Sequence, residues 1–359
     1  MSAPLSLNFQ ERVSFSLRDL YRQHGYTQYK MSKFEEYDLY ARNKDFLVDH
    51  SVITFMDTNG RLMALKPDVT LSIVKNTRDD AGTVQKLYYN ENVYRVSKSN
   101  GSFRELMQVG LECLGQIDDY CVCEVLSLAA ESLRAISPDC ILDISHLGLL
   151  SALVDAIGIP ADCKSQAFTA IGQKNLHELA ALCGTCGLSE SGTNLLKQAV
   201  TLSGPLNRVL PRLKELLSGI VDTKPLDQLL KISAVSADAH MFRFDFSAVD
   251  NLHYYNGIVF KGYLRGLPDS ILSGGQYSKL MEKMGRKSGA IGFAVYLDTL
   301  ERLEPRSQGF DVDTVLLYEE TTPMETIEAQ AGLLRQDGRS VLVQRHLPEN
   351  LRCRQIIRL

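Results

Sequence analysis

The sequence predicts an α+β protein that is built on an antiparallel sheet, carries a helical insertion and ends in a short α/β segment. Strand-like alternation of apolar and polar residues occurs in two groups, at about residues 85–115 and 241–280. Between the groups, residues 147–238 keep a helical pattern. After Pro305 the order becomes strand, helix, strand, which is typical of an α/β unit. We therefore expect a main domain over residues 1–305 and a truncated α/β segment over residues 306–359.

The N-terminal elements follow from local patterns. Apolar residues recur on one helical face within residues 8–24, and Gly25 predicts the end of that helix. Residues 55–65, FMDTNGRLMAL, place an Asn-Gly pair between two apolar runs, which predicts a β-hairpin. Pro67 follows the second strand of the hairpin, and we expect a short helix to begin near Asp68.

Residues 104–115, RELMQVGLECLG, predict a strand with two different faces. Because successive side chains of a strand point to opposite sides, the two sets of alternate residues separate. One face is apolar, and the other carries an amide, a glycine and a carboxylate. The apolar face has Met107, Val109, Leu111 and Cys113, and the opposite face has Leu106, Gln108, Gly110 and Glu112.

The remaining elements complete the expected order. A long helix is expected at about 119–136 and a strand at 139–146, before the helical insertion at about 147–238. Strands are then expected from 241–248 onward through the NGIVFKGYL and SILSGGQY stretches, and SGAIGFAVYLDTLERL should end in a helix. Beyond Pro305, FDVDTVLLYEE and SVLVQR should be strands that flank a helix ending at Gly338.

Composition excludes some classes of protein. The 359 residues carry a formal net charge of −4, so a large basic surface for nucleic acid is not expected. The N-terminus does not resemble a signal peptide, and no apolar run is long enough to span a membrane. We therefore expect a cytoplasmic protein without a membrane anchor.

Eight cysteines include the pairs Cys121/Cys123 and Cys183/Cys186, spaced CVC and CGTC. Such pairs can belong to a zinc or redox site, but a structural zinc site usually needs two pairs on rigid turns. Reduced thiols that pack as small apolar residues explain them better. We expect no metal and no cofactor.

Four separated stretches carry most of the chemical information. They are LKPDVT (65–70), YRVSKSNGSFRELMQVGLE (94–112), LHYYNGIVF (252–260) and SGGQYSKL (273–280). In this order they resemble class II aminoacyl-tRNA synthetases of the histidyl type over about residues 8–302, which is more specific than any single motif. The resemblance implies a six-stranded antiparallel sheet flanked by helices, and dimerisation through about residues 8–50.

The resemblance also implies a pocket for histidine. Asp68, Thr70 and Gln108 would hold the ammonium group, whose three donors need carboxylate, hydroxyl and amide acceptors. Glu112 and Tyr255 would contact opposite edges of the imidazole ring, and Tyr277 would close the pocket. Two adjacent tyrosines, Tyr254 and Tyr255, could also be ordinary strand residues. Their match together with Glu112, Gln108 and Asp68 favours the pocket.

Departures from the synthetase pattern fall on the groups that would handle ATP. An active enzyme would carry arginine where this chain has Asp250, and a carboxylate there repels both the reacting carboxylate and the phosphate. In the third motif, Tyr296, Asp298 and Thr299 replace glycine, glutamate and arginine. In the second motif, Ser97 and Ser102 replace a glutamate and an arginine, while Arg95 and Arg104 match and could retain phosphate contacts. Losing several cations removes most of the grip on a phosphate.

A retained amino-acid pocket without adenylation residues resembles the regulatory subunits of short-form ATP phosphoribosyltransferases. That resemblance implies a non-catalytic subunit, with no catalytic residues of its own, that assembles with a separate catalytic subunit for the first step of histidine biosynthesis. L-histidine is the implied ligand, and feedback regulation is a possible role. The C-terminal segment is shorter than a synthetase anticodon-binding domain, so tRNA is not an expected partner. Two alternatives stay open, namely a divergent active histidyl-tRNA synthetase and a stand-alone histidine-binding sensor.

Overall fold

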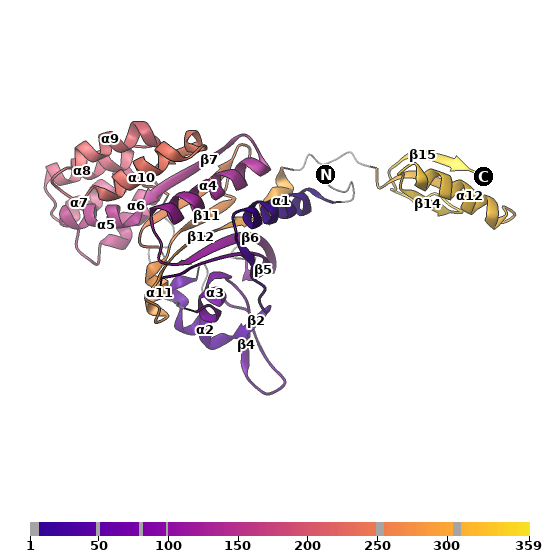
Figure 1. The fold of residues 1–359 in the computed structure, drawn as a ribbon, viewed down its shortest axis with the longest axis horizontal. Helices are drawn as coiled ribbons and strands as arrows, with labels where there is room; N and C mark the ends of the chain where they lie inside the picture. Colours follow the sequence, from indigo (N-terminus) through magenta and orange to yellow (C-terminus); the bar gives the residue numbers. More distant parts are fainter. Residues whose placement is uncertain (1–6, 48–50, 79–81, 98–99, 249–254, 304–309) are drawn as a thin grey trace. The chain divides into compact units, whose positions relative to one another are not determined.

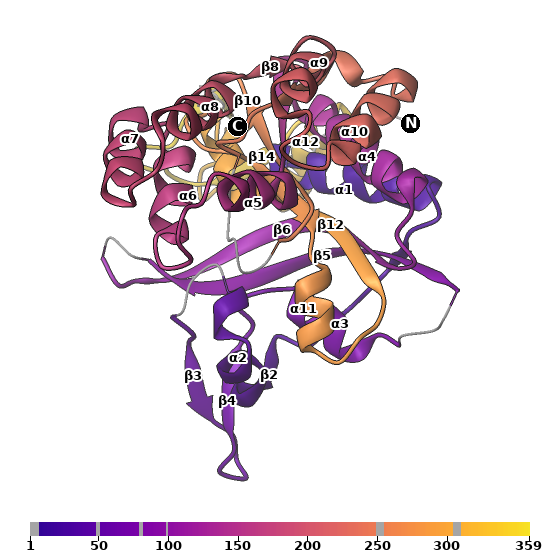
Figure 2. The ribbon, with the colours of Figure 1, turned by 90° about the vertical axis from the view of Figure 1, so that its left-hand side faces the viewer.

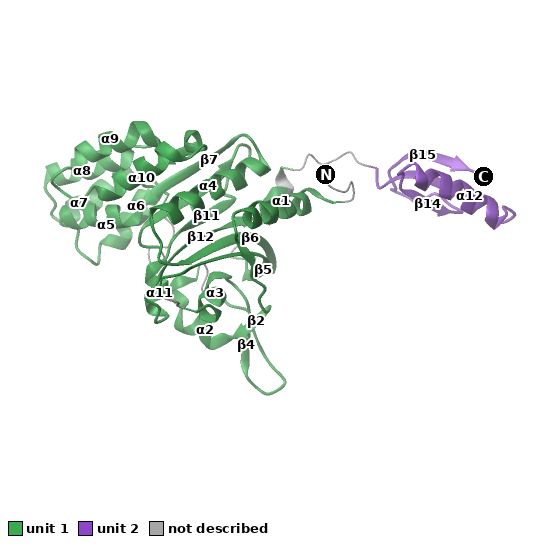
Figure 3. Ribbon diagram, in the orientation of Figure 1, with its two compact units in different colours: residues 1–303 green, residues 304–359 purple. Residues whose placement is uncertain are grey.

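The computed structural model describes residues 7–47, 51–78, 82–97, 100–248, 255–303 and 310–359. The chain divides into two compact units, residues 1–303 and residues 304–359 (Figure 3). The larger unit contains the central sheet and the helical insertion. The four stretches that resemble the synthetase motifs all belong to it.

The larger unit is organised around a nine-stranded sheet with the order β1-β5-β6-β12-β11-β10-β7-β9-β8 (Figure 1). Its six middle strands, from β5 to β7 in that order, pair antiparallel throughout, as the resemblance to class II synthetases implies. Short strands extend the sheet at both ends. β1 pairs parallel with β5 and β9 pairs parallel with β7, whereas β8 pairs antiparallel with β9. The strands are β1 (Thr27–Gln28), β5 (Val84–Val96), β6 (Phe103–Gly115), β7 (Cys140–His146), β8 (Gly204–Pro205), β9 (Phe242–Phe244), β10 (Ile258–Leu264), β11 (Leu272–Gln276) and β12 (Gly289–Tyr296).

One face of the sheet is covered by two amphipathic helices, α1 (Phe9–Gln23) and α4 (Asp119–Ile136). Asn8 and Glu11 form a reciprocal capping box at the start of α1, and Asp118 caps α4. The predicted apolar face of residues 104–115 is confirmed, because Val109, Leu111 and Cys113 lie fully buried in the main core.

The helical insertion is confirmed as a run of helices that continues the main core. Leu153, Leu196 and Leu213 from three of these helices are fully buried in the same cluster as the sheet residues. Figure 1 shows the helices gathered at the β7 end of the sheet. They are α5 (Leu147–Ala156), α6 (Lys164–Gly172), α7 (Leu176–Thr185), α8 (Glu190–Thr201), α9 (Leu206–Leu217) and α10 (Lys224–Val235).

The opposite face of the sheet, at the β5 and β6 end, is covered by a second group of elements with its own apolar cluster (Figures 1 and 2). This cluster includes Leu71, Val74, Leu280 and Met281. The group consists of α2 (Tyr37–Arg42), the 3-10 turn η1 (Lys44–Phe46), α3 (Thr70–Asn76), α11 (Ser278–Lys283) and a small sheet of order β2-β4-β3, with β2 (Phe34–Glu36), β3 (Thr54–Met56) and β4 (Leu62–Leu65).

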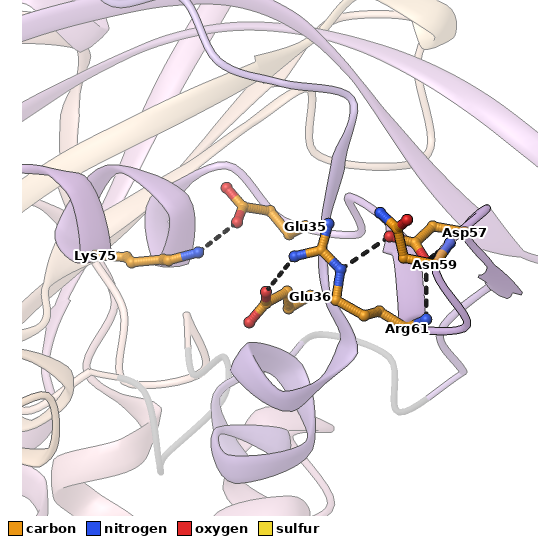
Figure 4. A network of polar contacts seen from close by, with 6 residues as sticks. All are labelled: Glu35, Glu36, Asp57, Asn59, Arg61 and Lys75. Atoms are coloured by element: carbon orange, nitrogen blue, oxygen red, sulfur yellow. Dashed lines mark hydrogen bonds and ion pairs between the residues drawn. The ribbon is translucent and has the colours of Figure 1, made fainter.

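The predicted hairpin at residues 55–65 is confirmed as β3 and β4, and charged contacts hold its turn (Figure 4). Asp57 accepts hydrogen bonds from the backbone N–H groups of Asn59 and Arg61, each at 2.8 Å. Arg61 forms ion pairs with Asp57 at 2.9 Å and with Glu36 at 3.4 Å. Nearby, Lys75 of α3 reaches Glu35 of β2 at 2.7 Å, so the small sheet is tied to α3.

The C-terminal unit is a three-stranded parallel sheet of order β14-β13-β15 with helix α12 between its first two strands. The sequence predicted β13 (Val312–Leu317), α12 (Met324–Gln336) and β14 (Val341–Gln344) but missed β15 (Cys353–Arg358). Burial alternates along β15, but its apolar residues do not, because Ile356 and Ile357 are adjacent, which explains the omission.

Two expected elements differ in detail. The strand expected at 241–248 is confined to β9, because the 3-10 turn η2 (Ala239–Met241) precedes it and a turn follows it. After β12 the expected helix is present as the 3-10 helix η3 (Leu297–Arg302). Among the described residues, no helix has both the length and the apolar character needed to cross a membrane.

Candidate functional site

The site lies on the polar face of the central sheet, where strand pairing places glycines beside a carboxylate. Glu112 of β6 is directly opposite Gly292 of β12, and Gly292 is opposite Gly275 of β11. Opposite residues of antiparallel strands share a face, so the three residues form one row. A Cβ on Gly292 would lie 1.8 Å from Glu112 Oε2, and one on Gly275 would lie 2.8 Å from the ring of Tyr255. The two glycines therefore make room for Glu112 and Tyr255.

Glu112 is the centre of the site. Its side chain is only 2% exposed, and both carboxyl oxygens accept hydrogen bonds. Thr70 Oγ1 donates to Oε1 at 2.7 Å, and the Tyr277 hydroxyl donates to Oε2 at 2.6 Å. The structure thus joins residues from three separate motifs, which lie 42 and 165 positions from Glu112 in the chain.

Burial raises the pKa of Glu112 to about 8, because water no longer stabilises its charged form. The hydrogen bonds from Tyr277 and Thr70 lower this pKa, and the nearby Asp68 carboxyl raises it. Burial likewise raises the pKa of Asp68, although the Leu71 N–H, Arg95 and Lys66 act in the opposite direction. The site therefore contains two acidic groups that disfavour each other's charge.

The loop that carries Asp68 is fastened to β5. Lys66 is fully buried and forms an ion pair with Glu91 at 2.9 Å, and its backbone carbonyl accepts from the N–H of Tyr94 at 2.8 Å. Arg95 Nε donates to the carbonyl of Pro67 at 3.2 Å. Arg95, expected to retain phosphate contacts, thus also contributes to holding this loop.

Gln108 lies on the same face of β6 as Glu112 and is 4% exposed. Its amide nitrogen Nε2 has no hydrogen-bond partner among the residues that the structure describes. A buried donor without a partner is costly, so such a group is typical of a position that a ligand completes.

The expected site residues differ in how directly the structure relates them. Glu112, Thr70 and Tyr277 are in direct contact, Asp68 influences Glu112 through its charge, and Tyr255 packs beside the glycine row. Arg104 lies directly opposite Arg95 in the register of β5 and β6, but it is exposed. Asp250 and Tyr254 lie outside the described residues.

Sequence reasoning missed two groups near the site, Lys66 and Tyr89. Lys66 lies inside the LKPDVT stretch, and the acidic Glu91 on the following strand was the available signal for a buried ion pair. Tyr89 is opposite Gly110, where a Cβ would lie 2.5 Å from its hydroxyl. Burial, Glu112 and Asp68 together raise the pKa of Tyr89, so the phenol stays neutral beside the acidic pair.

Thr299, which replaces the third-motif arginine, uses its hydroxyl locally. It donates to the backbone carbonyl of Tyr296 at 2.8 Å. Ser102, at the site of a second-motif arginine, donates to the side chain of Asn100 at 2.8 Å. Neither side chain can supply the positive charge that a triphosphate needs.

The described cysteines are all free thiols, and no group of three or more candidate metal ligands occurs among the described residues. Cys183 is buried in the main core. Cys186 contacts the thiol of Cys163, its neighbour across the α6–α7 pair.

The family follows from a direct comparison. The family model described as histidyl-tRNA synthetase matches residues 3–300. The chain therefore belongs to the histidyl-tRNA synthetase family, which has the class II synthetase-like fold described above.

Individual relatives show which members of this family the chain is similar to. The chain is 28% identical to the ATP phosphoribosyltransferase regulatory subunit of Caldanaerobacter subterraneus subsp. tengcongensis, over 94% of this chain and 90% of the relative. Among solved structures, an ATP phosphoribosyltransferase regulatory subunit/histidyl-tRNA synthetase from Bacillus halodurans C matches with a TM-score of 0.79 and 20% identity, covering 100% of this chain and 99% of that one. A chain of the ATP phosphoribosyl transferase (HisG:HisZ) complex from Thermotoga maritima matches with a TM-score of 0.63 and 20% identity, over 82% and 98%. At these identities the two structures support the fold.

Proposed function

We propose that this chain is the regulatory, non-catalytic subunit of an ATP phosphoribosyltransferase and that its Glu112 pocket binds L-histidine. The regulatory role in histidine biosynthesis rests on relatives that carry this name and match along most of the chain. Catalysis belongs to a separate subunit, in keeping with the two-component complex among the structural neighbours. The expected cytoplasmic location stays a prediction.

The buried carboxyl of Glu112, held between two hydroxyl donors, is the observation that carries the ligand proposal. A hydroxyl has one proton to donate, and Thr70 and Tyr277 both donate theirs to Glu112. Each hydroxyl therefore offers only lone pairs to a ligand. Together with Asp68, these groups make a pocket rich in acceptors, which matches a ligand rich in N–H donors.

Histidine fits this inventory. Its ammonium group supplies three donors for Asp68, Thr70 and the oxygen of Gln108. Its imidazole would donate an N–H to Glu112, and Tyr255 would contact the other edge of the ring. The unpartnered Nε2 of Gln108 is then available to the ligand's carboxylate as a neutral donor.

Regulation requires a difference between two states of the complex. A ligand shifts a conformational equilibrium only by its differential affinity, so the inhibited complex must bind histidine more tightly than the active one. We expect histidine to inhibit the assembled transferase and to have no catalytic effect on the isolated chain.

Two measurements test the proposal. The pure chain should show no histidine-dependent ATP–pyrophosphate exchange, and measurable exchange would support the divergent synthetase instead. The chain mixed with a catalytic phosphoribosyltransferase subunit should form a larger complex in light scattering and restore transferase activity. Failure to associate with that subunit, together with tight histidine binding, would favour the stand-alone sensor.

The expected dimer is part of the same proposal. We expect the dimer contact within about residues 8–50, which contain α1, β2 and α2. Light scattering of the isolated chain should give about twice the monomer mass. A strictly monomeric species, with the catalytic subunit also present, would contradict this part.

A further inference from the structure

We propose that Arg286, which no motif of the family resemblance includes, positions the two hydroxyl donors of the Glu112 pocket by clamping α3 to the segment that follows α11. The part of its test that measures histidine affinity rests on the proposed function. The contacts that support it are independent of any ligand.

Arg286 contacts the C-terminal end of α3. Its Nη2 donates to the backbone carbonyl of Val74 at 2.9 Å, lies 3.5 Å from that of Lys75, and also donates to that of Thr77. The last carbonyls of a helix have no partner within the helix and carry partial negative charge, so a guanidinium stabilises them. Arg286 itself is held after α11 by its N–H, which donates to the carbonyl of Met281 at 2.8 Å.

The two connected helices each present one donor to Glu112. Thr70 is the first residue of α3, and Tyr277 directly precedes α11. Figures 1 and 2 both show α3 and α11 side by side beneath the central sheet. The helices are therefore joined at one end through Glu112 and at the other through Arg286.

The position of both helices affects the carboxyl strongly, because hydrogen bonds weaken steeply as distance and angle depart from the optimum. The helices are short, with seven and six residues, and short helices do not hold their geometry without tertiary contacts. Ser72 and Lys75 bind Glu35, which ties α3 to the small sheet but not to α11. Arg286 supplies polar contacts between α3 and the α11 segment.

The test measures Glu112 directly in the full chain. Carboxyl-carbon NMR of glutamate-labelled protein would follow its titration, and Glu112→Gln would assign the signal. Because hydrogen bonds from Tyr277 and Thr70 lower the pKa of Glu112, Arg286→Met should raise its titration midpoint further. Histidine affinity should fall by about two- to tenfold, the range for one weakened hydrogen bond. Arg286→Lys, which retains a cation near the helix end, should restore much of both properties.

Arg134→Met is the matched control. Arg134 lies in the same unit and forms an ion pair with the buried Asp238, so this variant loses stability without touching α3, α11 or Glu112. It should leave the Glu112 midpoint unchanged. If Arg286→Met does not fold, the Glu112 midpoint and the histidine affinity are measured in Arg286→Gln, with the same expected changes.

The outcomes separate the two proposals. If the parent binds histidine but Arg286→Met leaves the Glu112 midpoint where it was, Arg286 is only a stabilising residue and the inference is overturned. If the parent binds no histidine but the midpoint rises in Arg286→Met, the ligand proposal fails and the positioning role stands. In a Tyr277→Phe background, the effect of Arg286→Met on affinity should shrink, and fully additive effects would count against positioning.

Discussion

Leu111 and Glu112 are neighbours in the chain, but they belong to opposite faces of the central sheet and serve different ends. Leu111 is fully buried among apolar side chains beneath α1 and α4. Glu112 is nearly as buried, yet it lies among hydroxyls and a second carboxyl. Similar burial therefore stabilises the fold at one position and carries an electrostatic cost at the next.

The comparison separates stability from binding within a single strand. Burying an apolar side chain contributes about 1.5–3 kcal/mol to folding. Burying a carboxyl contributes nothing of this kind and instead raises its pKa. A buried carboxyl with a raised pKa, on one face of a strand whose other face is apolar, is typical of a binding site. Substitutions on the apolar face should therefore lower stability, and substitutions on the polar face should lower histidine affinity.

The largest expected effect is on the apolar face. Leu111→Ala should lower the free energy of unfolding by about 2–5 kcal/mol, because it leaves a cavity in a packed core. Urea unfolding measures this loss. Histidine affinity, measured by calorimetry at a temperature where the variant stays folded, should change by less than about twofold, because Leu111 points away from the pocket. A large loss of affinity would show that the two faces are coupled.

The next effect is on the polar face. Glu112→Gln should weaken histidine binding by about five- to a hundredfold, since an imidazole N–H would lose its carboxyl acceptor, at a cost of about 1–3 kcal/mol. In the assembled transferase, the same variant should need more histidine for inhibition and keep its uninhibited activity. Glu105→Gln, an exposed change on the same strand, is the control and should bind histidine like the parent.

Two results would contradict this assignment. Unchanged calorimetric binding in Glu112→Gln would mean that the pocket is assigned wrongly. Lost binding with persistent inhibition would place the regulatory site elsewhere in the complex.

A smaller effect is expected on how stability depends on pH, and it also distinguishes the buried carboxyl from the apolar face. The pKa of Glu112 is raised in the folded state to about 8, so its stabilising contribution is complete below about pH 4.5 and is lost as pH rises towards 8. Glutamine does not titrate, so the stability of Glu112→Gln relative to the parent should rise between pH 5.5 and 7.5, by at most about 1.4 kcal/mol per pH unit.

Urea unfolding of both proteins at these two pH values measures the trend. The pKa of the exposed Glu105 is lowered, so its contribution is complete above about pH 4.5 and Glu105→Gln should give a flat difference in this window. A flat difference for Glu112→Gln as well would mean that the buried carboxyl is ionised throughout.

The smallest effect is expected at the exposed end of the polar face. Arg104→Gln should change the free energy of unfolding by less than about 0.5 kcal/mol, because its side chain is exposed. Histidine affinity should also stay the same. A clear loss of affinity for histidine would mean that the pocket extends along β6 beyond Gln108.

The sequence predicted much of this contrast. The alternation over residues 104–115 separated the faces correctly, and the Asn-Gly hairpin and the helical insertion were also recovered. These features depend on local periodicity and turn chemistry, which a single sequence displays. The meeting of Thr70 and Tyr277 at Glu112 depends on the family resemblance, because no local pattern relates residues so far apart.

Other features were not predictable in this way. The Lys66–Glu91 ion pair and the Arg286 clamp depend on tertiary contacts between segments whose own patterns are unremarkable. Strand β15 was missed because its apolar residues do not alternate in the sequence, although burial alternates along the strand. The strand expected over 241–248 was too long, since turn geometry, which the alternating pattern does not reveal, limits β9 to three residues.

The short outer strands of the central sheet limit how the protein can associate. An exposed sheet edge is a template on which another chain can add a strand. Here the outermost described strands are β1, whose two residues pair with Leu87 and Tyr88 of the thirteen-residue β5, and β8, whose second residue, Pro205, has no N–H to donate. In contrast, the C-terminal unit has a four-residue strand at one edge and a six-residue strand at the other. At the β8 end of the central sheet, protection of this kind disfavours both fibril-like aggregation and assembly by strand addition. Subunits should therefore meet this end of the sheet through side-chain surfaces, which leave the register of its strands undisturbed.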